Sequence, residues 1–159
     1  MLTFVSPSEE KEMKDYFSNR FGIPGDTFKA MRLLRSGRTI WLVADVLGLD
    51  AAFRSLKIEA SGVPLLRIRE SMVKPTTSAL QLFGQRATRN AVDLDDEALE
   101  TFLEAGTVSK TYPVEPGYVI LRWKGKVLGC GLYGRGKLRS QIPLTTWSNM
   151  KGRPESAEP

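Results

Sequence analysis

"GYVILRWKGKVLGCGLYGRGKLRS", residues 117–140, is the stretch that decides the fold of the second half of this chain. Residues 117–123 are rich in β-branched and aromatic side chains, which favour strands, and residues 126–133 are predicted to form a second, glycine-containing strand. The Lys124-Gly125 pair between them is typical of a tight hairpin turn, because glycine adopts left-handed backbone angles without strain. We therefore expect an antiparallel pair of strands here.

The same stretch continues into a third strand. A second turn over 134–136 leads to "KLRS" at 137–140, and Pro143 ends that strand because proline cannot donate to a hydrogen-bond ladder. Three short antiparallel strands in succession form a meander. The most economical architecture that contains such a meander is a small β-barrel.

Two nucleotide-binding motifs can also be read in these glycines. Gly129, Gly131 and Gly134 spell G-x-G-x-x-G, the dinucleotide fingerprint. Gly131, Gly136 and Lys137 spell the G-x-x-x-x-G-K of a P-loop. Both motifs require a helix after the glycine turn. The segment in that place, "RGKLRSQIPL", has another glycine, a proline and no apolar period of a helix.

Neither motif has the polar residues that its chemistry needs. Leu138 stands where a P-loop has the Ser or Thr hydroxyl that binds magnesium, and no Asp follows Asp96 in the chain. We therefore interpret the glycines as β-structure glycines, which mark bends, bulges or close approaches of another group. On this interpretation Cys130 is a small packed residue and not a nucleophile.

The composition narrows the class of protein. A length of 159 residues suits one ordinary domain or two small ones, and 23 Lys+Arg against 18 Asp+Glu favours a polyanionic partner. The absence of histidine and the single cysteine exclude Ser-His-Asp and Cys-His sites and a disulfide framework, and we expect no metal and no cofactor. Without a long apolar run or a signal-peptide pattern, we expect a soluble cytoplasmic protein.

The first part of the chain predicts a small α/β domain over residues 1–69. Ser6, Pro7 and Glu9 form the start of a capped helix, which Gly22 ends. Further elements are expected as a short helix capped by Asp26 that carries Phe28, Met31 and Leu34, and as strands over 39–44, 56–60 and 64–69.

Two helices are predicted between this domain and the meander. The first, over 74–84, has Thr76, Thr77 and Ser78 as competing N-caps. The second, "LDDEALETFLEAG", is expected to be capped by Asp93 and to end at Gly106. The final residues, 151–159, are rich in charge and proline and are expected to be disordered. The predicted fold class is therefore α+β.

The residues of the meander resemble a known family. "GYVILRWKGKVLGCGLYGRGKLRSQIP" is similar to the core of PUA-like domains, which are RNA-binding β-barrels, and most of all to the PUA-like module at the C-terminus of ribosomal RNA cytosine methyltransferases. There a "GY-V-L-R-x-x-G-x-x-L-G-x-G" strand pair precedes a "G-x-L-K-x-x-x-P" strand. The matching residues are Gly117, Tyr118, Val119, Leu121, Arg122, Gly125, Leu128, Gly129, Gly131, Gly136, Leu138 and Pro143, with Arg139 in place of the lysine.

This resemblance implies a PUA-like RNA-binding domain over residues 70–150 with flanking helices. The first 65 or so residues resemble, more weakly, the α/β domain that precedes PUA in small archaeal and eukaryotic ribosome-biogenesis proteins. The methyltransferases also carry a Rossmann-type catalytic domain with two cysteines, and this chain has neither the length for it nor the second cysteine. The resemblance thus implies RNA binding and does not imply methyl transfer.

The alternation of side chains along a strand supports the same function without the family. It places Arg122 and Lys124 on one strand face and Lys137 and Arg139 together on another, where several cations can meet phosphates. The alternative is an ordinary solvated face. Tyr118, Tyr133 and Trp147 are the candidates for base stacking. The predicted RNA-binding residues are Arg122, Lys124, Tyr133, Arg135, Lys137, Arg139, Lys74, Arg86 and Arg89.

The predicted function is therefore that of a non-catalytic RNA-binding protein. Its RNA is expected to be structured rRNA or tRNA, in RNA modification or ribosome biogenesis, with an RNA-modifying enzyme or assembly factor as a possible protein partner. One alternative is a scaffold of such a complex that does not itself bind RNA. A second is an enzyme using Asp15, Asp45 or Glu59, but no spacing among these carboxylates supports a catalytic pair.

Overall fold

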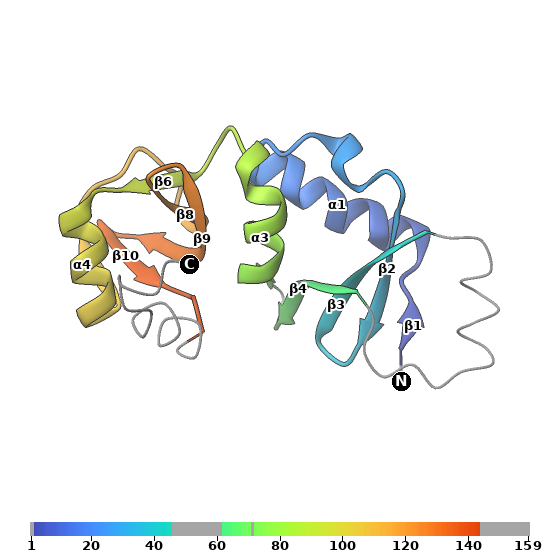
Figure 1. Cartoon of the computed structure of the whole chain (residues 1–159). Coiled ribbons are helices and arrows are strands. Elements are labelled where there is room, and N and C mark those ends of the chain that lie inside the picture. The colour runs from blue at the N-terminus through green and yellow to red at the C-terminus, as the bar shows by residue number, and fades with distance from the viewer. Residues whose placement is uncertain (1, 46–61, 71, 144–159) are drawn as a thin grey trace, which may run out of the picture. The chain divides into compact units, whose positions relative to one another are not determined.

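The computed structural model describes residues 2–45, 62–70 and 72–143 and divides the chain into two compact units, 1–89 and 90–159 (Figure 1). The first contains β1 (Thr3–Phe4), α1 (Pro7–Phe21), the 3-10 helix η1 (Gly25–Phe28), β2 (Met31–Ser36), β3 (Thr39–Ala44), β4 (Val63–Arg69), β5 (Met72–Pro75), α3 (Thr77–Phe83) and the 3-10 helix η2 (Gly84–Arg86). The second contains β6 (Ala91–Leu94), α4 (Asp96–Ala105), β7 (Thr107–Ser109), β8 (Gly117–Trp123), β9 (Lys126–Gly134) and β10 (Lys137–Ser140).

The chain is thus a mixed α+β protein, as the sequence predicts. Its described residues form two sheets, and the predicted α/β arrangement of the first part is not confirmed. The division after Arg89 falls later than the predicted boundary at residue 69. The reason is that β5 pairs with β4, and Thr76 at the start of α3 donates its amide and its hydroxyl to carbonyls of β4. The predicted strand over 56–60 and the predicted disordered tail over 151–159 lie outside the described residues.

The first unit is built on an antiparallel sheet of order β1-β2-β3-β4-β5. Here one prediction from the sequence is wrong, because Met31 and Leu34 lie on strand β2 and not on a helix after Asp26. The helical turn stops at Phe28, and "MRLLRS" then pairs residue by residue with "TIWLVA" in a hairpin. Buried side chains on both strands of this hairpin favour the sheet over the helix.

Helix α1 has the ends that its sequence predicts. The Ser6 hydroxyl accepts a hydrogen bond from the amide of Glu9, and Gly22 ends the helix with a left-handed φ of 65°. Its buried face carries Phe17 and Phe21, and the ring of Phe17 lies 5.5 Å from that of Phe28. These aromatic contacts anchor the helix and the following turn to one core.

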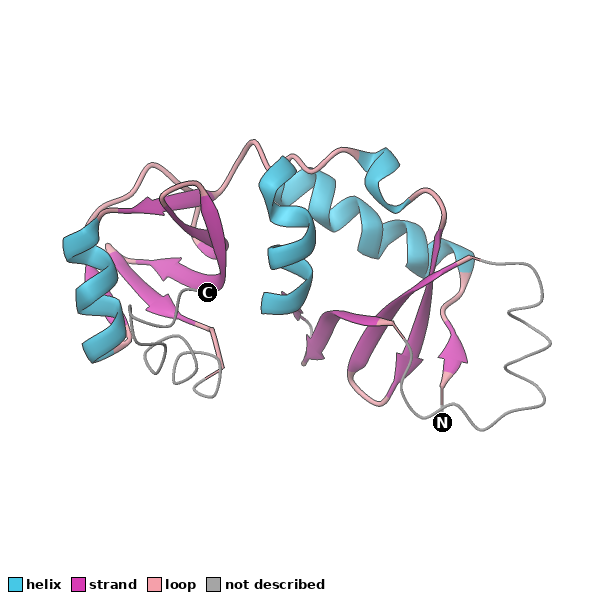
Figure 2. Cartoon of the chain, in the orientation of Figure 1, coloured by secondary structure: helices cyan, strands magenta, loops and turns pink. Residues whose placement is uncertain are grey.

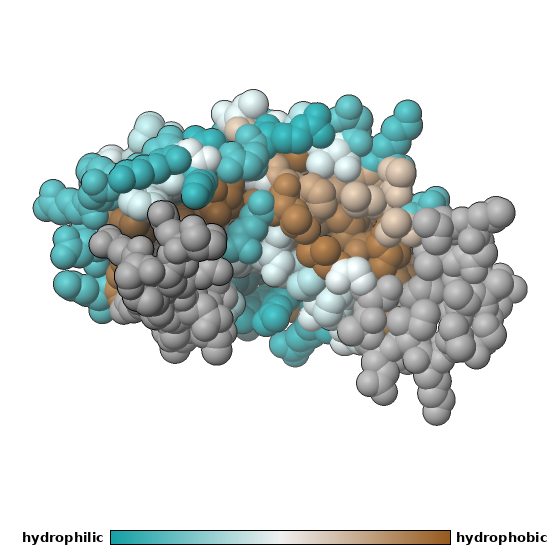
Figure 3. All heavy atoms as spheres, in the orientation of Figure 1, coloured by the Kyte–Doolittle hydropathy of each residue, from teal (hydrophilic) through white to brown (hydrophobic). Residues whose placement is uncertain are grey.

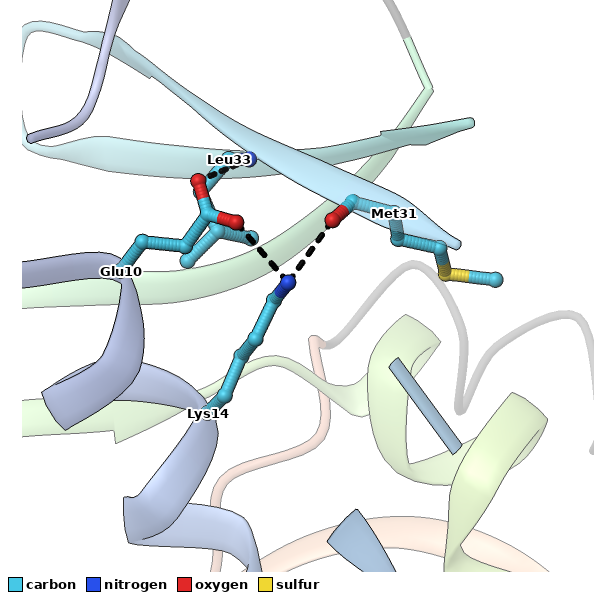
Figure 4. A network of polar contacts seen from close by, with 4 residues as sticks. All are labelled: Glu10, Lys14, Met31 and Leu33. Carbon is cyan, nitrogen blue, oxygen red and sulfur yellow. Dashed lines mark hydrogen bonds and ion pairs between the residues drawn. The ribbon is translucent and has the colours of Figure 1, made fainter. Parts of the chain in front are cut away.

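Side chains of α1 also protect an open edge of this sheet (Figure 4). Strand β1 is only two residues long, so it leaves part of the β2 edge without a strand partner. Glu10 accepts a hydrogen bond from the Leu33 amide at 3.3 Å, and Lys14 donates to the Met31 carbonyl at 2.7 Å and to Glu10 at 2.9 Å. The ion pair satisfies backbone groups that could otherwise pair with another chain.

The second unit is a five-stranded sheet of order β6-β8-β9-β10-β7, which curls beside α4 (Figure 2). The pair β6–β8 is parallel and the other pairs are antiparallel, so the predicted meander is confirmed. In Figure 3 hydrophilic residues, coloured teal, lie around the position of α4 on the visible side of this unit. The buried core of this unit contains Val92, Leu94, Ala98, Phe102, Val108, Val119, Leu121, Tyr133, Leu138 and Ile142.

The start of α4 differs from the sequence prediction. The N-cap is Asp95, whose carboxylate accepts a hydrogen bond from the Ala98 amide at 2.7 Å. Asp93, the predicted cap, lies on β6 instead. The chain stays extended to Leu94 because residues 91–94 pair in parallel with β8.

Both hairpin turns of the meander depend on left-handed residues. Lys124 and Gly125 have φ of 48° and 76°, and Arg135 and Gly136 have φ of 53° and 68°. Two consecutive left-handed residues are what a tight type I′ turn between twisted strands requires. Gly136 is therefore a turn glycine, and a strand, not a helix, follows it.

Gly131 has a different role inside the sheet. A Cβ atom at this position would lie 2.8 Å from Cδ2 of Leu121, a core residue of the neighbouring strand β8. Only a glycine leaves room for that side chain. The interpretation of these glycines as β-structure glycines is thus confirmed for Gly131 and Gly136, and Cys130 is a buried free cysteine.

Candidate nucleic-acid interface

The basic face of the second unit is centred on β10. Lys137 and Arg139 are exposed, whereas Leu138 between them is fully buried. Arg139 lies opposite Leu132 of β9, and Leu132 lies opposite Tyr118 of β8. Opposite residues of antiparallel strands share a face, so the arginine, the leucine and the tyrosine form one row on the side of the sheet opposite the core of this unit, which we call the outer side. Further along the same side Ile120 and Cys130 are fully buried.

The described residues provide no acidic partner for these cations. In the part of the chain that the structure describes, no acid lies within 4 Å of the amines or guanidinium groups of Lys126, Arg135, Lys137 or Arg139 (ion pairs in this unit involve other residues). Exposed lysines often guard the edge of a sheet, but β10 lies between β9 and β7. Edge protection therefore does not account for Lys137 and Arg139.

Arg122 is in a different situation. It lies opposite Asp93 in the parallel β6–β8 pair and donates to both carboxylate oxygens, at 2.9 and 3.1 Å. Its side chain is only 24% exposed. A bidentate arginine–carboxylate pair fixes the orientation of the guanidinium and neutralises its charge. This predicted RNA-binding residue is thus held inside the protein's own sheet.

The acids around α4 neutralise the rest of that side. Asp95 lies 3.7 Å from the amine of Lys110, in addition to capping the helix. Asp96 accepts a hydrogen bond at 2.8 Å from the indole nitrogen of Trp123, over whose ring Lys124 places its amine at 4.7 Å. The ion pairs Arg122–Asp93 and Lys110–Asp95 of this unit thus lie toward β6 and α4, and neither involves a cation of β9 or β10.

The three aromatic residues predicted for base stacking also differ in their surroundings. Tyr133 is buried in the core, and its hydroxyl accepts a hydrogen bond from the Tyr112 amide at 3.2 Å, so its ring is not available for base stacking. Tyr118 is half-buried and lies on the outer row beside the cations. Trp147 lies outside the described residues. Of these three, Tyr118 is the one that the structure places on the basic face.

Tyr112 was not among the predicted site residues, yet it has an unusual environment. Its hydroxyl is buried and has no hydrogen-bond partner among the described residues, and its ring meets that of Tyr133 edge to face with 6.2 Å between the ring centroids. Burial raises the pKa of the Tyr112 phenol, and the negative charge of Asp95 raises it further. Sequence alone gives no signal for this, because the contacts come from separate strands and loops.

Three predicted RNA-binding residues belong to the first unit. Arg86 lies 3.5 Å from Asp26 and donates to the hydroxyl of Thr27 at 2.8 Å. Arg89 donates to the Ser18 carbonyl at 2.9 Å, near the end of α1. Both guanidinium groups therefore make contacts within the first unit and stabilise its fold. Lys74, the third, is half-buried on β5, and Thr76 serves as the ordinary N-cap of α3.

The described residues contain no group of three or more metal-ligating side chains that could hold an ion, and none of the described helices is long and apolar enough to cross a membrane. What the second unit does have is a curled antiparallel sheet with a parallel edge strand, a single helix and an outward basic row. In the described residues this unit is a curled half-barrel beside helix α4, the arrangement that a PUA-like module would have.

Comparison with protein families shows which known domain the second unit resembles. Residues 89–144 match the family model described as the methyltransferase RsmF PUA domain. This segment is a PUA-like module of the kind found in rRNA cytosine methyltransferases, and the match begins at the boundary between the two units. A search of curated proteins returned no significant match to the chain.

Proposed function

We propose that this protein binds structured RNA through the outer face of β9 and β10 and does so without catalysing a reaction of its own. The observation that carries the proposal is the row that joins Arg139 and Tyr118, with Lys137 beside it and no acid among the described residues to neutralise either cation. Cations bind phosphates, and an aromatic ring beside them offers a surface on which a base can stack.

The RNA that we propose is ribosomal or transfer RNA, bound in the cytoplasm during RNA modification or ribosome assembly. The match to a module of rRNA methyltransferases supports this class of RNA. A protein of this kind would act with an RNA-modifying enzyme or an assembly factor, for which it would supply an RNA contact.

The test is the equilibrium binding of the full chain to a structured rRNA hairpin, measured by fluorescence anisotropy over a range of salt concentrations. We expect Lys137→Ala with Arg139→Ala to weaken binding by about tenfold and to reduce the slope of log K against log salt by roughly 2, because each phosphate contact contributes roughly 1 to that slope.

A matched control removes the same charge elsewhere. Lys11 and Lys29 are both exposed, on α1 and after η1, and Lys11→Ala with Lys29→Ala should leave the slope nearly unchanged. Equal weakening by both double variants would mean that only net charge matters. Unchanged binding in the Lys137 and Arg139 variant would contradict the proposal.

A further inference from the structure

The first unit carries a second basic face, on strand β4. Arg67 and Arg69 alternate with Ile68 and are both exposed. In the pairing of β4 with β5, Arg67 lies opposite Lys74 and Arg69 lies opposite Met72, which is itself 57% exposed. The outer side of this hairpin therefore combines positive charge with an exposed flexible apolar side chain.

Two cations of this face lie directly opposite one another on neighbouring strands, Arg67 on β4 and Lys74 on β5. The described residues provide no ion pair or hydrogen bond for the guanidinium of Arg67 or Arg69, although the acid Glu70 follows directly in the chain. Other cations of the same unit do have an acid within 4 Å, namely Lys11, Lys14, Arg35 and Arg86.

Edge protection does not explain these arginines either. In the sheet order β1-β2-β3-β4-β5 the strand β4 lies inside, between β3 and β5. An inner strand has both sides of its backbone paired, so it needs no charge to prevent pairing with another chain. Lys137 and Arg139 hold the same kind of position on β10 of the second unit.

A fourth cation lies next to this face. The carbonyl of Arg38, in the turn between β2 and β3, accepts a hydrogen bond from the Ile68 amide at 2.8 Å. The following residue, Thr39, lies opposite Arg67 in the β3–β4 pair. Arg38 is exposed, so its guanidinium adds to the positive field around Arg67 and Arg69.

We propose that this β4 face, made of Arg38, Arg67 and Arg69 with Lys74, is a second binding site for the phosphate backbone of RNA. Guanidinium groups present a planar set of donors that matches phosphate, and several in one field attract a polyanion. The inference rests on the proposed function, because it assigns the two units to one RNA ligand that each contacts through an inner basic strand.

The test measures binding of the full chain to the structured rRNA hairpin extended by a flanking single strand and, in parallel, to polyglutamate. Three double variants are compared, one at Arg67 and Arg69, one at Lys137 and Arg139, and one control. Arg67→Ala with Arg69→Ala is expected to weaken binding three- to tenfold and to reduce the salt slope by roughly 2, as roughly 1 per phosphate contact predicts. Lys11→Ala with Lys29→Ala is again the control of equal charge. Circular dichroism melting of each variant confirms that the fold is intact.

The outcomes separate this inference from the proposed function. If the Lys137 and Arg139 variant loses affinity and the Arg67 and Arg69 variant does not, the β4 site is overturned and the function stands. If neither variant changes RNA binding, both are overturned. If the Arg67 and Arg69 variant keeps its RNA affinity but loses binding to polyglutamate, the face serves an acidic protein and the inference is wrong.

Discussion

Arg122 and Arg139 belong to the same sheet, on strands β8 and β10, yet their surroundings differ. The guanidinium of Arg122 donates two hydrogen bonds to the carboxylate of Asp93, and the Arg122 side chain is 24% exposed. Arg139 is exposed, and the residues opposite it on the neighbouring strands are Leu132 and Thr107, which are not acids. The identity of the cross-strand neighbour therefore decides whether an arginine fixes the fold or remains available for a ligand. A count of cations in the sequence does not distinguish the two.

The largest expected effect is a loss of stability of the sheet that carries both arginines. Gly131→Val would place side-chain atoms on top of Leu121, whose Cδ2 already lies 2.8 Å from an ideal Cβ position. We expect a loss of about 3 kcal/mol in the free energy of unfolding, as for an overpacked core, measured by urea denaturation. Gly134→Ala is the control, because no atom lies within 4 Å of its Cβ position, and a similar loss there would contradict this explanation.

The next effect tests Arg122 directly. Arg122→Ala and Asp93→Ala should each lower the free energy of unfolding by about 1 kcal/mol, and a double-mutant cycle should show that the two losses are not additive. Arg139→Ala should change stability by less than about 0.5 kcal/mol, as expected of an exposed side chain without partners. The loss of RNA affinity should show the opposite order, with a larger loss for Arg139→Ala than for Arg122→Ala. A larger RNA defect in Arg122→Ala than in Arg139→Ala would reverse the comparison.

The smallest effect concerns the tyrosine next to this core. Because burial raises the pKa of Tyr112, its phenol should ionise at higher pH than an exposed tyrosine, as followed by ultraviolet absorbance. A pKa raised on folding favours the protonated form, so its contribution to stability is complete below the ordinary pKa and is lost as the pH rises through the folded value. Tyr112→Phe should remove the late step; an unchanged titration curve would contradict the assignment.

Local signals in the sequence were sufficient for much of the fold. Ser6 and Gly22 mark the ends of α1, and the Lys124-Gly125 turn marks the first hairpin of the meander, because caps and tight turns depend on neighbouring residues. The sequence prediction of a helix at Met31 is wrong, because "MRLLRS" suits a helix or a strand until its partner strand is known.

The site was harder to predict than the fold, for a physical reason. Asp93 and Arg122 are 29 residues apart, and only the parallel pairing of β6 with β8 makes them neighbours. A register shift between Leu121 and Arg122 also interrupts the simple alternation of faces along β8. The cations that the sequence predicted correctly as exposed, Lys137 and Arg139, lie on a short strand where alternation holds.

The central claim is that RNA contacts the face of β9 and β10 and not the paired side. The most direct test is a titration of the isotope-labelled full chain with the structured rRNA hairpin, followed by amide chemical shifts in NMR spectra. We predict the largest shifts over residues 132–139 and at Tyr118, with small ones over α4 and at Asp93. Shifts confined to α4 and β6, or none in the second unit, would contradict the account.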